Sequence, residues 1–293
     1  MVLDGMPGRV EKNYPLKQLT TWKIGGPAEF AYWPQTFQDL KEARQRAMAA
    51  KVPLWLVGRG SNLLLPDEGL PGITLVTTQL RSIDWGDYTV RVEAGYPLAR
   101  LAQEVGERGW GGLEFARGIP GTVGGAVIMN AGAHGGEIAS LIERVSAITV
   151  NGTIRTFERA EIEFGYRFCS LRGEVWITEA VLKFTRGDRT EILQMMRENL
   201  RNRSMNQPLE IPNAGSVFRN PPGNSAGRLI EAAGWKGRSI GGAQVSNKHA
   251  NFIVNTGGAK ATDVLALIAE IQRDVQEKYG FDLQTEIEYL GKK

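Results

Sequence analysis

The spacing of apolar residues predicts that both helices and strands occur along this chain. Between residues 36 and 51, Leu40, Ala43 and Ala47 recur at helical intervals, and Thr36 begins a capping-box pattern that marks the first turn. Short apolar runs bounded by turn residues predict strands. The predicted helices cover residues 36–51, 97–109, 188–203, 225–233 and 262–279. The predicted strands cover residues 52–57, 63–65, 73–76, 89–94, 145–150, 153–157, 175–184, 251–254 and 284–290.

Turn and charge patterns join these elements into an α+β chain. Asn151-Gly152 lies between two apolar runs, which is typical of a β-hairpin. The long helix after Asp188 is amphipathic, with arginines on its outer side. Its inward residues are predicted to be Ile192, Leu193, Met196 and Leu200. These patterns divide the chain into an N-terminal part that ends near residue 185 and a C-terminal part after it.

Composition narrows the class of protein. The chain has 293 residues, which favours two or three subdomains over one compact core. A hydrophobic content of 42% and a charged content of 23% are ordinary for a globular protein. The net charge of +3 arises from 35 basic and 32 acidic residues, so it gives no indication of nucleic-acid binding. It suits a small anionic ligand that is held by local charges.

Cysteine and histidine usage excludes several chemistries. Cys169 is the single cysteine, so an internal disulfide and a cysteine-based zinc cluster are excluded. The two histidines, His134 and His249, are too few and too far apart to favour a metal site. No apolar run reaches the roughly 18 residues that span a bilayer. The N-terminus lacks the apolar core of a signal peptide. We therefore expect a cytoplasmic protein with no membrane insertion.

Two glycine-rich segments are the strongest signs of a ligand. The segment from Gly118 to Ala133 and the loop Gly58-Arg-Gly-Ser-Asn62 each allow a close backbone approach. The second follows a predicted strand, but Leu63 stands where a Rossmann fingerprint needs glycine, and the Walker sequence is absent. A tight turn without a ligand explains either loop alone. Together they suit a dinucleotide diphosphate, for which FAD is a candidate.

Single polar residues are ambiguous when they are taken alone. Arg167 offers a forked donor that suits a carboxylate, although most such arginines form surface salt bridges. Ser216 lacks both the nucleophile-elbow sequence and a nearby histidine, so a proton-donating or turn serine is favoured over a nucleophile. Glu286 and Glu288 share one face of the last strand, where solvated carboxylates are common. His249 precedes an apolar strand and suits a structural role equally well.

The motifs in series resemble one family. Thr21-Trp-Lys-Ile-Gly-Gly-Pro27, Gly58–Asn62, Gly118–Gly125, Asn130–Ala133, Phe164-Gly-Tyr-Arg167, Gly215-Ser-Val-Phe218 and Glu286 occur in this order. Each motif is weak by itself, but the series is specific and spans roughly Asn13 to Leu290. The chain resembles the UDP-N-acetylenolpyruvoylglucosamine reductases, the MurB family of peptidoglycan synthesis. The short C-terminal part resembles the type II form.

The resemblance implies an architecture and a reaction. The fold would be α+β, with a vanillyl-alcohol-oxidase-like FAD-binding domain in two subdomains, residues 1–75 and 76–187, and a substrate domain, residues 188–293. FAD would bind non-covalently, and NADPH would reduce it. The enolpyruvyl ether of UDP-N-acetylglucosamine would then receive hydride from flavin N5 and become UDP-N-acetylmuramate. NADPH and the UDP-sugar would share one cleft, and the protein would be a monomer without nucleic-acid or metal partners.

The resemblance also implies site residues. Arg167 would bind the substrate carboxylate, Glu286 would donate a further hydrogen bond to it in protonated form, and Ser216 would protonate the second carbon. The residues implied to bind FAD are Gly58, Arg59, Gly60, Ser61, Asn62, Gly118, Ile119, Pro120, Gly121, Thr122, Gly124, Gly125, Asn130, Ala131 and Gly132. Those implied to line the substrate side are Tyr166, Asn220, Arg228, Lys236 and His249.

One departure and two alternatives accompany this resemblance. Relatives often carry a lysine before Gln-Pro-Leu where this chain has Asn206, so Arg203 or Lys236 would have to supply that contact. An oxidase with FAD tethered covalently through His134 is one alternative, which acid precipitation of the flavin tests. A nucleotide-sugar binding module without catalysis is the other. Such a module would have no need of Ser216 and Glu286 together, and its preparation would be colourless.

Overall fold

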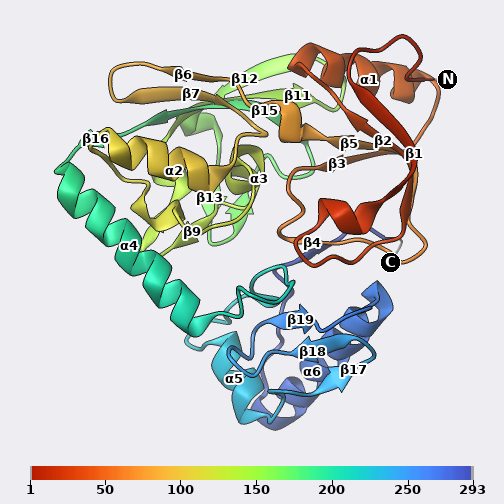
Figure 1. The fold of residues 1–293 in the computed structure, drawn as a ribbon, viewed down its shortest axis with the longest axis vertical. Coiled ribbons are helices and arrows are strands. Elements are labelled where there is room, and N and C mark those ends of the chain that lie inside the picture. Colours follow the sequence, from red (N-terminus) through yellow and green to blue (C-terminus); the bar gives the residue numbers. More distant parts are fainter. Residues whose placement is uncertain (1, 292–293) are drawn as a thin grey trace. The chain divides into compact units, whose positions relative to one another are not determined.

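The structure is a computed structural model that describes residues 2–291, and these form two compact units along the chain (Figure 1). Unit 1 contains the residues up to Lys12, Phe30–Arg59 and Gly72–Arg203. Unit 2 contains Asn13–Glu29, Gly60–Pro71 and the residues from Ser204 onward. These units divide the chain differently from the expected three parts, because two N-terminal segments group with the C-terminal residues. The three-part division stays a prediction.

A five-stranded antiparallel sheet with the order β12-β11-β15-β7-β6 is the larger sheet of unit 1 (Figure 1). Its strands are β6 (Ile83–Trp85), β7 (Thr89–Glu93), β11 (Ile142–Thr149), β12 (Ile154–Glu158) and β15 (Val175–Lys183). Asn151-Gly152 joins β11 to β12, and Gly152 has a φ of 75°, so the predicted hairpin is confirmed. Helix α3 (Val123–Ile128) packs on β15 and β7.

A second sheet has the order β1-β2-β5-β3. Its strands are β1 (Arg9–Pro15), β2 (Pro27–Trp33), β3 (Leu54–Val57) and β5 (Leu70–Val76), of which β3 and β5 are parallel. Helix α1 (Phe37–Ala49) buries Leu40, Ala43 and Ala47 in the same apolar cluster as Ile73 and Leu75. The predicted capping box is present, because the Thr36 side chain accepts from the backbone of Asp39 and the Asp39 carboxylate accepts in return.

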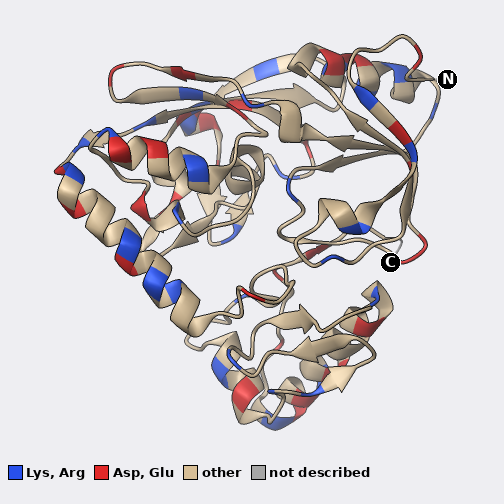
Figure 2. Cartoon of the chain, viewed as in Figure 1, with Lys and Arg blue, Asp and Glu red and all other residues tan. Residues whose placement is uncertain are grey.

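The remaining elements of unit 1 are short, apart from two helices. They are α2 (Leu98–Glu107), β8 (Trp110–Gly111), β9 (Gly132–Ala133), β10 (Gly136–Glu137), β13 (Phe164–Gly165), β14 (Phe168–Cys169), β16 (Thr185–Arg186) and most of α4 (Arg189–Asn206). Of the four residues predicted to face inward on α4, Ile192 and Met196 are buried, while Leu193 and Leu200 are half-buried. Figure 2 marks basic and acidic residues along the ribbon of this helix.

Unit 2 packs two helices and a short sheet around its own core. The sheet has the order β17-β18-β19, and a parallel pair joins β20 to β4. Their bounds are β4 (Leu63–Leu64), β17 (Ser239–Ile240), β18 (Ala243–Val245), β19 (Ile253–Asn255), β20 (Glu288–Tyr289), α5 (Ala226–Ala232) and α6 (Ala261–Tyr279). Helix α6 packs on α5, β17 and β18. Trp22 is fully buried in this core and donates to the carbonyl of Ile253 at 2.9 Å.

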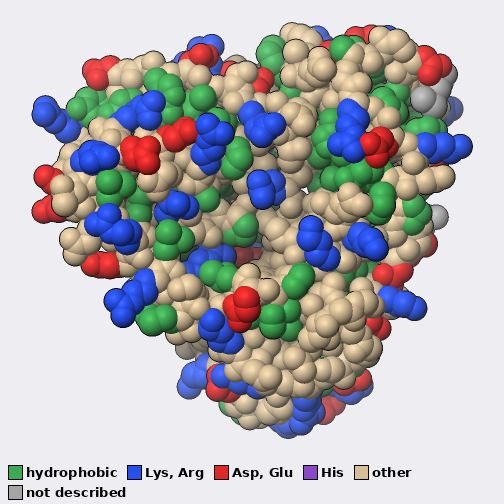
Figure 3. All heavy atoms as spheres, viewed as in Figure 1, with side chains coloured by type: hydrophobic (Ala, Val, Ile, Leu, Met, Phe, Trp, Pro, Cys, Tyr) green, Lys and Arg blue, Asp and Glu red, His purple; other side chains and the backbone are tan. Residues whose placement is uncertain are grey.

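The face of the molecule in Figure 3 mixes basic, acidic and apolar side chains, as the nearly balanced charge predicts. No helix among residues 2–291 is both long enough and apolar enough to cross a membrane. Cys169 is fully buried in unit 1, and burial raises the pKa of its thiol.

Candidate functional site

The start of the first glycine-rich segment contacts the second segment within unit 1. Gly58 directly follows β3, and a Cβ built on it would lie 2.8 Å from the hydroxyl of Thr122. Thr122 is buried and caps α3, since its hydroxyl accepts from the backbone N–H of Gly125 at 3.5 Å. The structure therefore brings the start of the first loop to the capping residue of the second, as a shared ligand would require.

Several of these glycines are required by contacts within the protein. Gly60 has a φ of 56°, and a Cβ there would lie 2.1 Å from the carbonyl oxygen of Leu19. A Cβ on Gly124 would lie 2.8 Å from Cβ of Ala94, whose carbonyl accepts the Gly124 N–H at 2.8 Å. The interpretation that these glycines only leave room for a ligand is therefore incomplete, because they also let the loops pack against neighbouring backbone.

A half-buried cation, Arg203, lies beside the second segment. A Cβ on Gly118 would lie 3.0 Å from Cδ of Arg203, and burial lowers the pKa of this guanidinium. Its Nε is buried and has no hydrogen-bond partner among the described residues. A desolvated guanidinium with an unused donor suits a phosphate oxygen. On this observation, the residues around Gly118 fit the diphosphate of a dinucleotide such as FAD.

Asn130 organises the end of the second segment. Its side chain is almost fully buried and its φ is 41°. The amide donates to the Glu137 carboxylate at 3.0 Å and to the Gly165 carbonyl at 2.9 Å, and its oxygen accepts from Ala139 N–H at 3.2 Å. The amide thus ties three segments of unit 1 together. Any contribution of Asn130 to FAD binding would come through its backbone or through the segments that it holds.

The hairpin that Asn130 holds carries Tyr166 and Arg167 at its tip, between β13 and β14. Arg167 has a left-handed φ of 54°, which costs about 1 kcal/mol for a residue with a Cβ. Its guanidinium donates to the Gly132 carbonyl at 3.1 Å and lies over the exposed Tyr166 ring. Such strained residues cluster at functional sites, where the surrounding structure fixes them.

Ser216 lies in a segment of unit 2 that Asn251 frames. Both the side-chain oxygen and the side-chain amide of Asn251 bond the backbone of Phe218, at 2.9 and 2.8 Å. The Asn251 carbonyl also accepts from Val217 N–H at 2.8 Å. Ser216 is half-buried, and Gly215 before it has a φ of 79°. The sequence did not identify Asn251 as a residue of the site. The only sign in the sequence is an amide side chain at the start of the predicted strand 251–254.

The structure brings the segments of Ser216 and Glu286 side by side. Glu286 N–H donates to the Val217 carbonyl at 2.7 Å, and Phe218 forms an antiparallel bridge with Thr285. Glu286 is half-buried. Asn62, from the first glycine-rich loop, donates its amide to the Glu286 carbonyl at 3.0 Å. A residue predicted to bind the cofactor therefore also positions a residue predicted to be catalytic.

The four predicted substrate residues of unit 2 gather around α5. Asn220 accepts from the Ala226 N–H at 3.0 Å and so caps the helix, while Arg228 projects from it and is exposed. His249 packs against Gly227 and edge-on to Phe252. The fifth predicted residue, Tyr166, belongs to unit 1.

Two charged neighbours distinguish His249 from an ordinary surface histidine. Its Nδ1 accepts from Asn251 N–H at 3.2 Å, so the ring is neutral. Burial lowers the pKa of His249, and the positive charge of Lys236 lowers it further. Lys236 in turn bonds Glu231 at 2.7 Å. The imidazole can therefore donate through Nε2 but carries no charge at neutral pH.

Comparisons with known families match two regions of the chain to two different domains. Residues 28–158 match the model of an FAD binding domain, and residues 207–290 match the C-terminal domain of UDP-N-acetylenolpyruvoylglucosamine reductase. The first region contains both glycine-rich segments, and the second contains Ser216 and Glu286. Arg167 lies between the two matched regions.

Relatives cover nearly the whole chain. The UDP-N-acetylenolpyruvoylglucosamine reductase of Bacillus licheniformis is 45% identical over 98% of this chain and 95% of its own length. That of Halalkalibacterium halodurans is 43% identical over 98% of this chain and 96% of its own. The crystal structure of the reductase (MurB) from Thermus caldophilus is 39% identical, with a TM-score of 0.82 over 97% of this chain and 99% of that one.

The fold and the matched domains define an FAD-dependent oxidoreductase, and the expected α+β class is confirmed. The expectation that the cofactor is FAD is confirmed as well. The chain belongs to the UDP-N-acetylenolpyruvoylglucosamine reductase family. The individual site residues and the mechanism stay predictions.

Proposed function

We propose that this chain reduces the enolpyruvyl ether of UDP-N-acetylglucosamine to UDP-N-acetylmuramate, with NADPH as the electron donor. The pairing of the Ser216 segment with the Glu286 segment carries this proposal, because a proton donor and a carboxyl group then lie on neighbouring backbone. A binding module without catalysis has no need of that pair. The near-complete coverage by named reductases supports the same reaction.

FAD, when bound, would supply the hydride transfer from NADPH to the terminal alkene carbon of the substrate. Hydride addition leaves negative charge on the neighbouring carbon and its carboxylate. We assign Arg167 to bind that carboxylate through two parallel hydrogen bonds, since a guanidinium fork matches its geometry. Glu286, in protonated form, donates a further hydrogen bond to the same group.

Ser216 completes the reaction by giving its hydroxyl proton to the carbon next to the carboxylate. A hydroxyl is a weak acid, but a carbanion is basic enough to take its proton. The serine then recovers a proton from solvent, so the overall reaction consumes NADPH and one proton. This role needs no histidine beside Ser216, because the serine never attacks the substrate.

Stopped-flow measurement of the two half-reactions tests the assignment. We expect Ser216→Ala to keep flavin reduction by NADPH near the parent rate and to lower substrate reduction by about 10³-fold or more. Ser225→Ala is the matched control, because Ser225 precedes α5 and its side chain makes no capping hydrogen bond. Equal loss of both half-reactions in Ser216→Ala would show that the assigned role is wrong.

We further propose that FAD is held without a covalent bond, that NADPH and the UDP-sugar share one cleft, and that the protein is a monomer of the type II form. His134, the residue of the alternative tether, is exposed at a left-handed turn. Acid precipitation should release all flavin into the supernatant. Flavin that stays with the protein pellet, and is lost in His134→Ala, would overturn the non-covalent assignment.

A further inference from the structure

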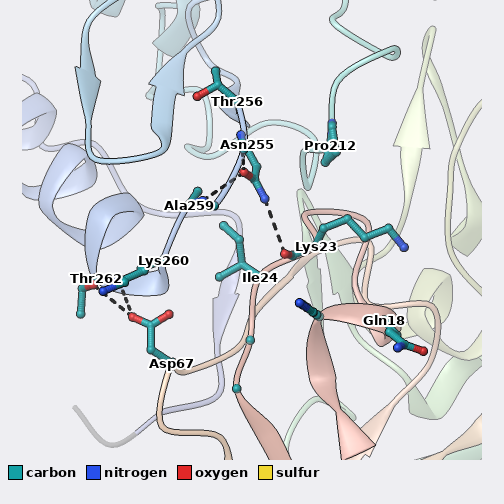
Figure 4. Close-up of a pocket in the computed structure, with 15 residues that line it drawn as sticks. Gln18, Lys23, Ile24, Asp67, Pro212, Asn255, Thr256, Ala259, Lys260 and Thr262 are labelled. Carbon is teal, nitrogen blue, oxygen red and sulfur yellow. Dashed lines mark hydrogen bonds between the residues drawn. The ribbon is translucent and has the colours of Figure 1, made fainter.

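A groove in unit 2 shares no residue with the predicted site. It has a volume of about 1060 Å³ and lies between the loop from Lys17 to Gly26 and the segment from Asn255 to Thr262 (Figure 4). This volume lies just above the range of about 300–1,000 Å³ that is typical of small-molecule pockets. Nothing in the proposed reductase mechanism uses this groove.

The groove is positively charged. Lys17, Lys23 and Lys260 line it and are exposed, and Asp67 is its single acidic lining residue. The Asp67 carboxylate is already engaged at the start of α6, where it accepts from Ala261 N–H at 2.7 Å. It also accepts from the N–H and the hydroxyl of Thr262, at 3.1 and 3.0 Å (Figure 4). The three lysines therefore line the groove without a free carboxylate among its other lining residues.

A buried asparagine fixes the two walls of the groove. The Asn255 amide donates to the carbonyl of Trp22 at 3.0 Å. It also donates to the carbonyl of Lys23 at 3.5 Å (Figure 4). Its oxygen accepts from Gly257 N–H at 3.0 Å and from Ala259 N–H at 3.2 Å. A single side chain thus sets the geometry of both loops, so the groove is formed before any ligand binds.

Lys23 occupies its position at a conformational cost. Its φ is 59°, a left-handed conformation that glycine adopts more easily than lysine does. Gly257 and Gly258, on the opposite wall, have open space where a Cβ would be. Because a left-handed φ favours glycine, the backbone turn at position 23 does not require a lysine. The Lys23 amine does add positive charge to the groove.

We propose that this groove is a second ligand site, which binds a diphosphate-bearing anion of the nucleoside diphosphate class. Three lysines from the two walls of the groove match a ligand with several negative charges better than a single carboxylate. The volume of about 1060 Å³ leaves room for a nucleoside beside the diphosphate. The site is independent of the proposed reaction, so its failure would leave the reductase assignment intact.

Titration calorimetry of the FAD-loaded protein with inorganic pyrophosphate and with UDP tests the proposal. We expect the Lys17→Ala, Lys23→Gly, Lys260→Ala triple variant to lose one binding event, and Lys23→Gly alone to weaken that event about tenfold. Lys51→Gly is the matched control, since Lys51 has a left-handed φ of 55° but lies outside the groove. Lys51→Gly should bind both probes as the parent does.

Stability separates loss of binding from loss of folding. Lys23→Gly and Lys51→Gly should each keep or raise the parent Tm, because glycine relieves the left-handed strain. Weaker binding of UDP or pyrophosphate in Lys23→Gly at an unchanged or raised Tm supports the groove as the site. Binding of both probes by the triple variant with the stoichiometry and affinity of Lys51→Gly would overturn the proposal.

Discussion

The side-chain amide of Asn62 donates to the backbone carbonyl of Glu286 at 3.0 Å, and the Asn62 carbonyl accepts from Glu288 N–H at 2.9 Å. One residue thus fixes two points of the C-terminal segment. Glu286 N–H is held in turn by the carbonyl of Val217, next to Ser216. The first glycine-rich loop and the predicted proton donor are therefore linked through the backbone of Glu286.

Removing this link should affect both stability and substrate reduction. We expect Asn62→Ala to lower the free energy of unfolding by about 1 kcal/mol, the value of one hydrogen bond, and to slow substrate reduction more than flavin reduction. Asn62→Asp keeps the size but loses the donor, so it should behave like Asn62→Ala. Stopped-flow rates and chemical denaturation measure the two effects. Equal slowing of both half-reactions would argue against a positioning role toward Glu286.

Gly60 should be required for folding whether or not FAD is bound. We expect Gly60→Ala to lower the free energy of unfolding of the apoprotein by roughly 3 kcal/mol, because the new Cβ would meet the Leu19 carbonyl in a left-handed turn. Gly173→Ala is the control, since Gly173 also has a positive φ but open space around it. That change should cost about 1 kcal/mol. Similar losses in the two variants would contradict the steric explanation.

Asn130 should act through the hairpin of Arg167. Replacing Asn130 with alanine leaves the Gly165 carbonyl and the Ala139 N–H without their partners, which should cost about 3 kcal/mol. We also expect a higher KM for the UDP-sugar, because Arg167 is then held less firmly. Denaturant unfolding and steady-state kinetics measure these changes. A loss of FAD affinity with unchanged stability would indicate a direct cofactor contact instead.

His249 should make stability depend on pH. Its folded pKa lies below the usual value of 6.5, so below that pH the unfolded chain binds more protons than the folded protein does. Stability should therefore fall as the pH is lowered through about 6.5 toward the folded pKa. His249→Gln should reduce the difference in Tm between pH 7.5 and pH 5.5, values chosen on either side of about 6.5.

His134→Gln is the control for this measurement, since His134 is the one other histidine and is exposed. It should keep the parent difference in Tm. Comparing differences between two pH values cancels the loss of the ring contact with Phe252, which lowers stability at both. A parent-like difference in His249→Gln would show that another group causes the pH dependence.

Local signals predicted most of the regular structure. The capping box of Thr36, the helix that became α6 and the hairpin at Gly152 depend on neighbouring residues, and each formed as expected. Strands β1 and β2 were not predicted: β1 is mostly polar and lies at the edge of its sheet, and β2 lacks a regular alternation and lies between β1 and the more distant β5. The predicted final strand is only Glu288–Tyr289 as a named element, since its earlier residues bond the Ser216 segment irregularly.

Long-range contacts limited the prediction of the site. The resemblance identified Ser216 and Glu286, but the sequence carries no signal that Val217 and Glu286 exchange a hydrogen bond. Asn251 and Asn255 gave no signal either, because a buried amide is recognised by its partners and not by its neighbours in sequence. The glycines were interpreted as space for a ligand, whereas Gly60 is explained by a backbone oxygen from another segment.

Cys169 gives this chain a built-in chemical reporter. The thiol is fully buried and its pKa is raised, so it is a poor nucleophile in the folded protein. A thiol reagent should therefore modify the protein only when the β13–β14 hairpin opens. The rate of modification would then report the rate of that opening. Because no second cysteine competes, a cysteine introduced at an exposed position such as Tyr166 would take a fluorophore or spin label at that position alone.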